Sequence, residues 1–447
     1  MVNVRILSTS AVRAQSHQPN QPSPKVELTP WDLQLLLVGP IQKGLLFHKP
    51  KFSQDNTCMI IRRLETSLSR TLDFFAPLAG RLATVELGSG NTSFYINCNN
   101  AGAFFVRAVA DDVTMADVVE PVFVPDIVHS FFALNGSTNY EGISSPLLAV
   151  QVTELVDGFF IGCTINHAVA DGTSFWHFFN SWSEICRGFL KPSKPPVLKR
   201  WFPDGTDYPI GIPTLISKMK PGKFTSPILK ERVFHFARQG IAELKTKANS
   251  EIGTNKISSL QALLSHIWRC VVRCQSPDSD QEVSFKLLIG VRTRLKPPLP
   301  EGYFGNAVQV GPLTMAAKEL QKLGHGHAAW KMNKTVAWHT EDKLCSFYKA
   351  WIKDPKLLTM NNVTTNALVT SSSPRFDVYG NDFGWGKPVA VRSGAGNKHD
   401  GKITVFAGVE EGSVDTEVCL LPETLERLGT DTEFMATVSV PDKLMPN

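Results

Sequence analysis

The stretch that most constrains the fold is an apolar run followed by one His, one Asp and a helical pattern rich in aromatic residues. Residues 159–161 (Phe-Phe-Ile) predict a buried strand, and residues 173–187 predict a helix. His167 and Asp171 therefore lie at a strand-to-helix junction, where binding and catalytic side chains are commonly carried. Because an unperturbed His has a pKa near ~6.5, His167 can be a free base at neutral pH. Asp171 either fixes the tautomer of His167 or braces the turn.

Composition narrows the class of protein. The chain has 447 residues, more than one hydrophobic core usually supports, so we expect two domains. Hydrophobic residues make up 43% and charged residues 19%, which indicates a globular chain. A net charge of +5 is too small to favour nucleic acid. Without a signal-peptide core in residues 1–24 or an apolar run of membrane-spanning length, we expect a cytosolic protein that does not bind membranes.

A proline-rich segment divides the chain into two halves. Residues 190–227 carry eight prolines and little periodicity, which is typical of a linker or crossover. We therefore expect an N-terminal domain at 1–189, a crossover at 190–227 and a C-terminal domain at 228–447. Both halves mix strand and helix patterns, so the predicted class is α/β or α+β, in two layers with a cleft between them.

Local patterns predict the following elements. In the first half, strands are expected over 92–98, 104–109, 147–154 and 159–166, a helix over 59–75, and irregular structure over 110–145. In the second half, strands are expected over 232–236, 284–291, 365–372, 387–392, 402–409 and 413–421. Helices are expected over 239–249, 260–274, 314–323 and 327–352, and Ser258 is expected to cap the second of these.

A second motif alternates glycines with large aromatic residues. Asp382, Phe383, Gly384, Trp385 and Gly386 indicate close backbone approach and rigid packing. A structural turn is the favoured interpretation, in which the Asp carboxylate accepts hydrogen bonds from backbone or Arg donors. No Gly-rich phosphate loop accompanies the Asp-Phe-Gly triplet, so its likeness to the protein-kinase triplet is accidental.

Two weaker features involve Arg and His. Arg292 either pairs with a buried carboxylate or belongs to a solvated basic turn, and the sequence favours neither. The Gly-His-Gly-His stretch at 324–327 has no nearby Cys or carboxylate ligand set, so we expect a loop and no metal site. Eight scattered Cys without a Cys-x-x-Cys motif indicate reduced thiols.

Taken together, these stretches resemble the BAHD acyl-CoA-dependent acyltransferases of plants. The His-x-x-x-Asp-Gly signature of that family matches residues 167–172, ending at Gly172, and its Asp-Phe-Gly-Trp-Gly signature matches residues 382–386. Further matching stretches lie at 28–33, 77–82, 258–269 and 303–306. The resemblance covers nearly the whole chain in order.

The resemblance implies an architecture. It implies two chloramphenicol-acetyltransferase-like domains, each a mixed β-sheet with flanking helices, joined by a long crossover loop. C-terminal strands are expected to complete the N-terminal sheet. His167 is expected midway along a channel between the domains. The protein is expected to be a monomer that binds acyl-CoA as a co-substrate and a small-molecule acceptor, without a bound cofactor.

The resemblance also implies roles for particular residues. His167 would act as general base, and Asp171 would hold the loop through a salt bridge, for which Arg292 is the best candidate. Ser258 and Lys245 are candidates for binding the phosphates of CoA. The donor that stabilises the oxyanion stays open among a backbone amide and the side chains of Thr370, Ser372 and Trp385.

Three positions depart from patterns seen in parts of the family. Asn166 stands where many relatives have a second His. Gly290 stands where some have an Asp near the Arg-x-Arg stretch, which leaves the ion pairing of Arg292 open. Ala307 stands where relatives that transfer malonyl groups often have Cys, which disfavours that branch.

Two other functions remain possible from the sequence. The same cleft and His could catalyse elimination on an amide or ester conjugate without CoA, which would make the protein a lyase. The chain could also be a catalytically silent binding module, although the intact residues of the first signature argue against this.

Overall fold

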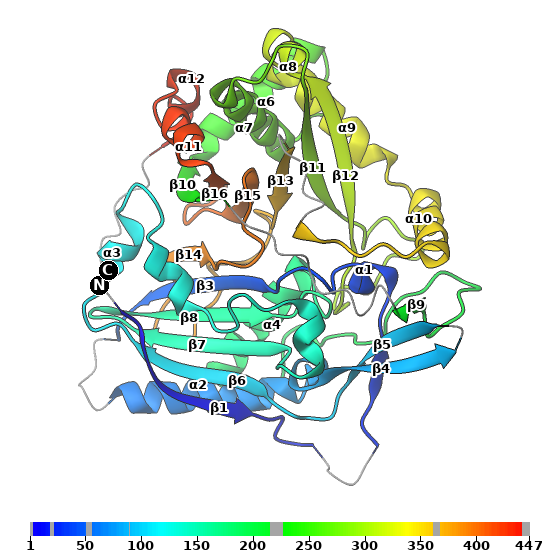
Figure 1. The fold of residues 1–447 in the computed structure, drawn as a ribbon. Coiled ribbons are helices and arrows are strands. Elements are labelled where there is room, and N and C mark those ends of the chain that lie inside the picture. The colour runs from blue at the N-terminus through cyan, green and yellow to red at the C-terminus, as the bar shows by residue number, and fades with distance from the viewer. Residues whose placement is uncertain are drawn as a thin grey trace.

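Three β-sheets and the helices packed against them make up a computed structural model of the chain (Figure 1). The structure describes residues 3–17, 22–50, 56–88, 90–214, 227–360 and 367–439.

The first sheet carries the strand that leads to His167. Its order is β1-β6-β7-β8-β3-β14, with β6 and β7 parallel and the other neighbours antiparallel. Helices α2 and α4 pack against each other beside this sheet, and their apolar side chains join its core. The strands are β1 (Arg5–Val12), β3 (Ile41–His48), β6 (Ala103–Val109), β7 (Leu148–Glu154), β8 (Gly158–Ile165) and β14 (Ala390–Ser393), and the helices are α2 (Asn56–Leu72) and α4 (Gly172–Cys186).

Strand β14 reaches the first sheet from the far half of the sequence. It pairs antiparallel with β3, so that Ala390 lies opposite Leu46 and Ser393 lies opposite Lys43. In Figure 1, β14 runs directly alongside β3. The two halves of the chain are therefore joined by backbone hydrogen bonds within one sheet.

The second sheet has the order β10-β16-β15-β13-β11-β12. Its short central strand β13 runs parallel to both β11 and β15. One face packs against α7 and its neighbouring helices in a separate apolar core. The strands are β10 (Lys230–Phe236), β11 (Glu282–Gly290), β12 (Val308–Ala316), β13 (Ala367–Ser371), β15 (Lys402–Ala407) and β16 (Val414–Leu420), and the helices are α6 (Arg238–Ile252), α7 (Ser259–Gln275), α8 (Ala317–Lys322), α9 (His325–Trp338), α10 (Glu341–Lys353), α11 (Pro422–Leu428) and α12 (Thr432–Met435).

The third sheet includes part of the proline-rich segment. It consists of β2 (Lys25–Glu27), β5 (Asn91–Asn97) and β4 (Arg81–Gly88), and β9 (Gly211–Pro213) pairs with β5. The segment is therefore held against the first half of the chain by strand pairing. Residues 215–226 of the predicted crossover lie outside the described residues.

Several sequence predictions of local structure are wrong. The single helix predicted over 327–352 is two helices, α9 and α10, with His339 and Thr340 between them. A helix was predicted over 314–323, but residues 308–316 form β12, and α8 spans only Ala317–Lys322. Leu313 and Met315 are buried while Pro312 and Thr314 are exposed, which is the two-residue period of a strand. The predicted irregular region over 110–145 contains short helices: α3 (Met115–Val119), η2 (Asp126–Phe131) and η3 (Asn139–Ile143).

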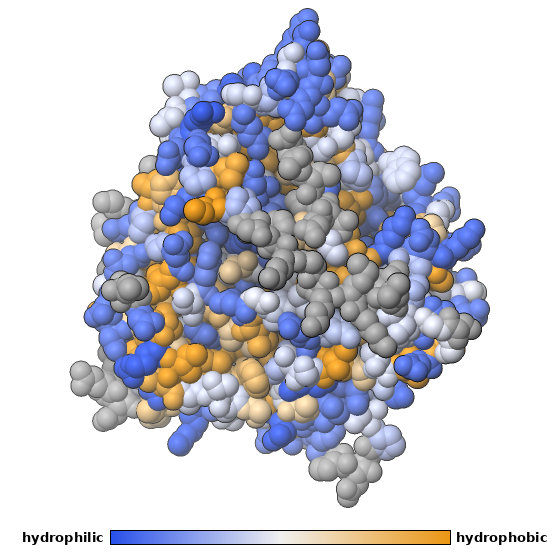
Figure 2. Space-filling model, in the orientation of Figure 1, coloured by the Kyte–Doolittle hydropathy of each residue, from blue (hydrophilic) through white to orange (hydrophobic). Residues whose placement is uncertain are grey.

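Hydrophilic and apolar residues are unevenly distributed over the surface of the molecule. Hydrophilic residues cover the top of the molecule, and apolar residues show in patches lower on the same face (Figure 2). Among the described residues, no helix is long and apolar enough to cross a membrane.

A tight approach fixes the strand that delivers His167. Gly162 of β8 is paired with Gly44 of β3, and a Cβ added at Gly162 would lie 2.2 Å from the backbone oxygen of Phe131. We expect Gly162→Ala to destabilise the protein by about 1–3 kcal/mol, because backbone must move to admit the methyl group. Gly290→Ala is the matched control, since a Cβ there meets nothing within 4 Å. Thermal unfolding of both variants tests this, and equal melting temperatures would contradict it.

Candidate active site

His167 is held by its backbone and left free at its side chain. Its N–H donates to Oδ1 of Asn139 at 2.7 Å, and its carbonyl accepts from Nδ2 of Asn306 at 2.7 Å. Asn139 begins η3, and Asn306 lies two residues before the start of β12, so His167 is held by two distant parts of the chain. The imidazole is partly exposed, and its buried Nδ1 has no hydrogen-bond partner among the described residues.

The surroundings of the ring favour its neutral form. Burial lowers the pKa of His167 below its ordinary value, and the charge of Lys402 lowers it further. The backbone of His167 itself, the negative charge of Asp171 and the backbone of Ala170 raise the pKa but do not outweigh burial. The ring is therefore a free base at neutral pH, as a general base must be.

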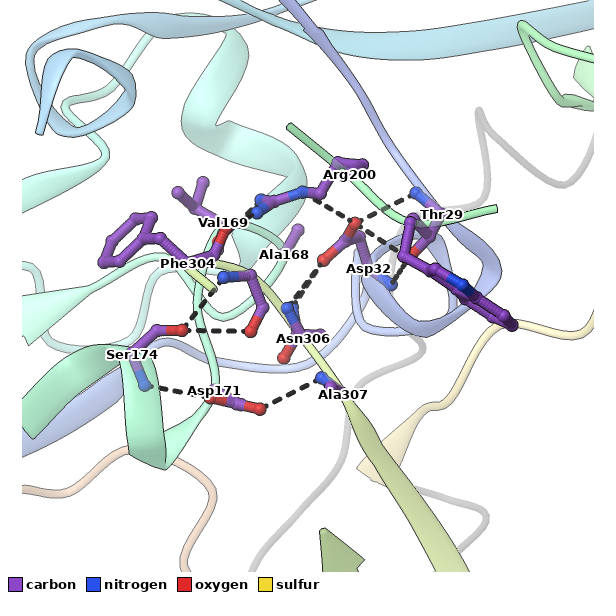
Figure 3. A network of polar contacts seen from close by, with 12 residues as sticks. Thr29, Asp32, Ala168, Val169, Asp171, Ser174, Arg200, Phe304, Asn306 and Ala307 are labelled. Carbon is purple, nitrogen blue, oxygen red and sulfur yellow. Dashed lines mark hydrogen bonds and ion pairs between the residues drawn. The ribbon is translucent and has the colours of Figure 1, made fainter. Parts of the chain in front are cut away.

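Asp171 spends its carboxylate on groups other than the imidazole. Its two oxygens accept from Nη1 and Nη2 of Arg292 at 2.6 and 2.9 Å, which makes a bidentate ion pair. Oδ1 also accepts from the N–H of Ser174 and caps α4, and Oδ2 accepts from the N–H of Ala307. Figure 3 shows the carboxylate between Ser174 and Ala307. Asp171 therefore positions the loop. Among the described residues, its carboxylate makes no hydrogen bond with the side chain of His167.

This ion pair answers the open question about Arg292. The side chain is only 14% exposed, so the interpretation as a solvated basic turn is wrong, and the predicted salt bridge to Asp171 is confirmed. Arg292 also donates to Oγ of Ser174 at 3.1 Å and to the carbonyl of Gly305 at 2.9 Å. Burial alone would raise the pKa of Asp171, but Arg292 and the two backbone N–H groups lower it below its ordinary value.

A second polar network supports the other side of the loop. Asp32 is fully buried, and its carboxylate accepts from Thr29 and from Nδ2 of Asn306 at 2.8 Å. It also forms an ion pair with Arg200, whose Nε lies 3.3 Å from Oδ2. Arg200 donates to the carbonyl of Val169 at 2.8 Å and also to the carbonyl of Phe304. These contacts are drawn in Figure 3. Loop carbonyls that no strand or helix satisfies are thus satisfied by side chains.

Sequence reasoning missed most of these supporting residues. Asn139 and Arg200 were not singled out, and Asp32 and Asn306 were noted only within matching stretches. A local signal did exist for Asp32, because Thr29 and Asp32 form the capping box that begins α1 (Pro30–Leu33). Arg200 lies in the proline-rich segment, and its partners Asp32 and Val169 are far away in sequence, so no local pattern marks it.

The glycine and aromatic motif forms a tight turn beside α4. Oδ1 of Asp382 accepts from the N–H groups of Gly384 and Gly386 at 2.6 and 3.1 Å, as expected for a structural turn. Both glycines have positive φ angles, 102° and 117°, which larger residues rarely adopt. Phe383 packs on Trp182 of α4 with ring centroids 4.8 Å apart.

The same motif offers one unused polar atom. Trp385 stacks on Phe383, and its buried Nε1 has no partner among the described residues.

Two other candidate oxyanion donors lie at the end of β13. The hydroxyl of Thr370 donates to the carbonyl of Lys286 at 3.3 Å. Ser372 has a φ of 67° and a buried Oγ without a partner in the described part of the chain.

The two candidates for CoA binding lie near each other on the exposed side of the second domain. Ser258 caps α7, where its side chain accepts from the N–H of Gln261. Lys245 lies on the exposed surface of α6. Asn249 connects the two segments, since its side chain donates to the carbonyl of Lys245 and accepts from the N–H of Ile257.

The histidines at 325 and 327 are not gathered into a cluster. His325 is buried, and its Nε2 lies 3.1 Å from the carbonyl oxygen of Leu244, whereas His327 is exposed. The stretch begins α9, although a loop was predicted there. Within the described ranges, no three His, Cys, Asp or Glu side chains are grouped as a metal site would require.

Comparisons with known proteins identify the family. A sequence profile described as the Transferase family matches residues 2–435. The protein named BAHD acyltransferase DCR of Arabidopsis thaliana is 33% identical over 458 aligned residues, which cover 97% of this chain and 93% of that protein. The chain belongs to the BAHD acyltransferase family. An uncharacterized acetyltransferase of Arabidopsis thaliana is 42% identical and covers 97% of this BAHD acyltransferase and 99% of its own length.

Solved structures show the same fold. The crystal structure of vinorine synthase has a TM-score of 0.74 at 19% identity and covers 98% of this chain and 99% of its own. TRI101 of F. graminearum complexed with ethyl coenzyme A has a TM-score of 0.73 at 18% identity, covering 93% and 99%. The predicted α/β fold with two sheet-containing, chloramphenicol-acetyltransferase-like domains is confirmed. The protein is an acyltransferase of the BAHD type.

The ion pair of this BAHD acyltransferase can be tested by removing one charge. Asp171→Asn leaves Arg292 buried without its anion, and we expect a loss of about 3–5 kcal/mol in stability together with lower activity. Asp111→Asn is the control, because the Arg5–Asp111 pair is more than 60% exposed on both sides and should contribute below about 1 kcal/mol. Chemical denaturation of both variants measures this. Similar losses in the two variants would show that Asp171 does not brace the loop.

Proposed function

We propose that this BAHD acyltransferase transfers an acyl group from acyl-CoA to a hydroxyl or amine of a small molecule, with His167 as general base. The observation that carries the proposal is the state of His167. Its backbone N–H and carbonyl are both hydrogen-bonded, while its neutral ring is partly exposed and its buried Nδ1 has no hydrogen-bond partner among the described residues. The solved TRI101 complex with ethyl coenzyme A supports a CoA thioester as the donor, since that protein shares the fold.

The reaction follows from what a neutral imidazole can do. The ring accepts the proton of the acceptor O–H or N–H as that atom attacks the thioester carbonyl, a contribution of roughly 10²–10⁴-fold. The tetrahedral intermediate then collapses, the C–S bond breaks, and the thiolate of CoA takes the proton from the imidazolium of His167. The acceptor attacks directly, so no acyl-enzyme forms. Asp171 and Arg292 keep the loop in place and exchange no proton.

The oxyanion of the intermediate needs a donor. Among the three predicted side chains, Ser372 and Trp385 are the best candidates for the oxyanion donor. Each has a buried donor atom with no partner among the described residues. The hydroxyl proton of Thr370 is already given to a backbone carbonyl. A backbone amide remains the alternative.

CoA would meet the second domain through its phosphates. Ser258 stands at the N-terminus of the long helix α7, which favours anions, and Lys245 lies one hydrogen-bonded link away through Asn249. We assign both to the phosphate groups of CoA.

The remaining expectations complete the proposal. The enzyme acts as a cytosolic monomer without a bound cofactor. Its domains span 1–189 and 228–447, joined by the crossover at 190–227, with β14 added from the second domain to the sheet of the first. His167 lies in the channel between these domains.

Substitution of the base is the direct experiment. We expect His167→Ala to reduce acyl transfer by about 10²-fold or more, because the acceptor loses its proton acceptor, while the melting temperature and CoA binding stay near wild type. The matched control is His327→Ala, which changes an exposed His outside the loop. Mass spectrometry of a panel of acyl-CoA donors with alcohol and amine acceptors gives the activity.

Two results would overturn the proposal. One is a His167→Ala variant that keeps the wild-type rate. The other is cleavage of an amide or ester conjugate without consumption of acyl-CoA, which would make the protein a lyase using the same residue.

A further inference from the structure

One face of the second sheet carries charged residues toward the first sheet. Residues paired in register across β11, β13, β15, β16 and β10 share a face, and one such row reads Lys286, Val369, Lys402, Cys419 and Glu231. The opposite face carries the apolar core under α7. Neighbouring strands lie about 4.8 Å apart, so the two lysines of the row, two strands apart, have backbones separated by roughly 10 Å.

The same face meets the first sheet at β14. Glu417 of β16 accepts from the N–H and the hydroxyl of Ser393 on β14. Lys43 of β3 donates to the same hydroxyl and lies over the ring of Phe406 on β15. The charged row therefore lies in the seam between the two sheets, with Glu231 buried and the two lysines partly exposed.

The carboxylates at the seam already have partners. Glu231 and Glu417 both pair with Lys398, and Glu231 also lies 2.9 Å from Nε2 of His129. By contrast, neither Lys402 nor Lys286 forms an ion pair with any described residue. Within the described ranges, the hydrogen bond that the Nζ of Lys402 donates goes to the carbonyl of Gly396, at 3.0 Å. Glu417 and Glu231 are near enough to act on the charge of Lys402, but their direct ion pairs are with Lys398. An ammonium group held in a seam without a direct ion pair is costly, so this arrangement favours a ligand that brings an anion.

A buried histidine beside the lysines is also incomplete. His399 is 8% exposed, its Nδ1 lies 3.2 Å from the carbonyl oxygen of Asn397, and its buried Nε2 has no partner among the described residues. Burial, with Lys402 and Lys286 nearby, lowers the pKa of His399 to about 4, so the ring is neutral. With the proton on Nδ1, the free Nε2 accepts a hydrogen bond.

Hydrogen bonds connect Lys402 to the strand that carries His167. Gly396, whose carbonyl holds the ammonium group of Lys402, donates its N–H to Oε1 of Gln42 at 2.8 Å. Gln42 of β3 lies opposite Thr164 of β8, three residues before His167. The charge of Lys402 reaches far enough to lower the pKa of His167. The unpaired lysine and the general base thus belong to one region of the seam.

We infer that Lys402, together with Lys286 in the same row and the free Nε2 of His399, binds a carboxylate-bearing acceptor, with a hydroxyl of that acceptor donating to His399. The identification of the ligand as the acceptor substrate rests on the proposed function. The binding of a carboxylate at Lys402 does not depend on it. The substrate class is a hydroxy carboxylic acid whose carboxylate is held by the lysines and whose hydroxyl donates to His399, while a separate hydroxyl or amine of the same molecule is the nucleophile that faces His167.

Binding alone tests the site without turnover. Benzoate and its neutral isostere benzamide are titrated by calorimetry into the full-length protein. We expect wild type to bind benzoate at least about 10-fold more tightly than benzamide, and Lys402→Met to lose that preference, because a hydrogen bond to a charged group is worth that much. Lys318→Met, at an exposed lysine, should retain it. Equal binding of both probes by wild type, or an unchanged preference in Lys402→Met, would overturn the inference.

Two further variants separate the possible failures. Lys286→Met removes the partly exposed end of the row, so it still tests the site if Lys402→Met does not fold, and we expect a weaker preference for benzoate. His167→Ala should keep the preference in full. Loss of the preference in His167→Ala would contradict the inference. Loss of turnover with the preference retained would show that the carboxylate binds independently of the general base.

Turnover identifies which substrate carries the carboxylate. For a hydroxy acid that the enzyme acylates, Lys402→Met should raise KM about 10-fold or more with little change in kcat, and leave the methyl ester unaffected. Succinyl-CoA and butyryl-CoA form the donor comparison. A rise in KM for succinyl-CoA alone would place the carboxylate on the acyl group and overturn the assignment to the acceptor.

Discussion

The bidentate ion pair between Asp171 and Arg292 fastens the loop that carries His167 to a segment 121 residues further along the chain. It links the loop after β8, the N-terminus of α4 and the segment before β12, and every oxygen and the two terminal nitrogens involved have hydrogen-bond partners. A buried charge that loses its partner costs several kcal/mol, so the loop cannot move away from the second domain cheaply. The geometry of His167 depends on that constraint.

Around this ion pair, side chains satisfy the backbone of the loop, although Nε of Arg292 and Nε of Arg200 have no hydrogen-bond partner among the described residues. Both backbone groups of His167 are bonded to Asn side chains, and Asp32 and Arg200 satisfy neighbouring peptides. Buried polar atoms usually have partners, so the unused nitrogen of His167 is informative. The seam repeats the contrast, because Glu231 and Glu417 form ion pairs with Lys398 while Lys402 forms no direct ion pair with a described residue.

Features set by local sequence were predictable. The buried strand and the following helix around His167, the cap at Ser258 and the glycine turn at 382–386 each follow from neighbouring residues, and the structure has all of them. Features set by distant partners were not. Residues 314–316 were predicted as helix, but they belong to β12. Pairing with β11 makes this segment a strand, and that pairing cannot be seen in the local sequence.

Long-range polar contacts show the same limit. Arg200 contacts residues 31 and 104 positions away along the chain. Lys402 and Lys286 are far apart in sequence, and only the strand pairing of the folded sheet places them in one row. The pairing of Arg292 with Asp171, across 121 positions, was expected only through family resemblance. Signature residues and caps can thus be predicted from the sequence, whereas the groups that brace them require the fold.

The protonation state of His167 is the claim on which the chemistry depends. Histidine-labelled protein can be titrated by NMR, with the His167 signal assigned by its absence in His167→Ala. Because burial lowers the pKa of this ring, we expect its midpoint below the ordinary value of about 6.5, with the ring neutral at pH 7 and protonated only in more acidic solution. A midpoint above pH 7, which would leave the ring charged and unable to accept a proton, would contradict the account.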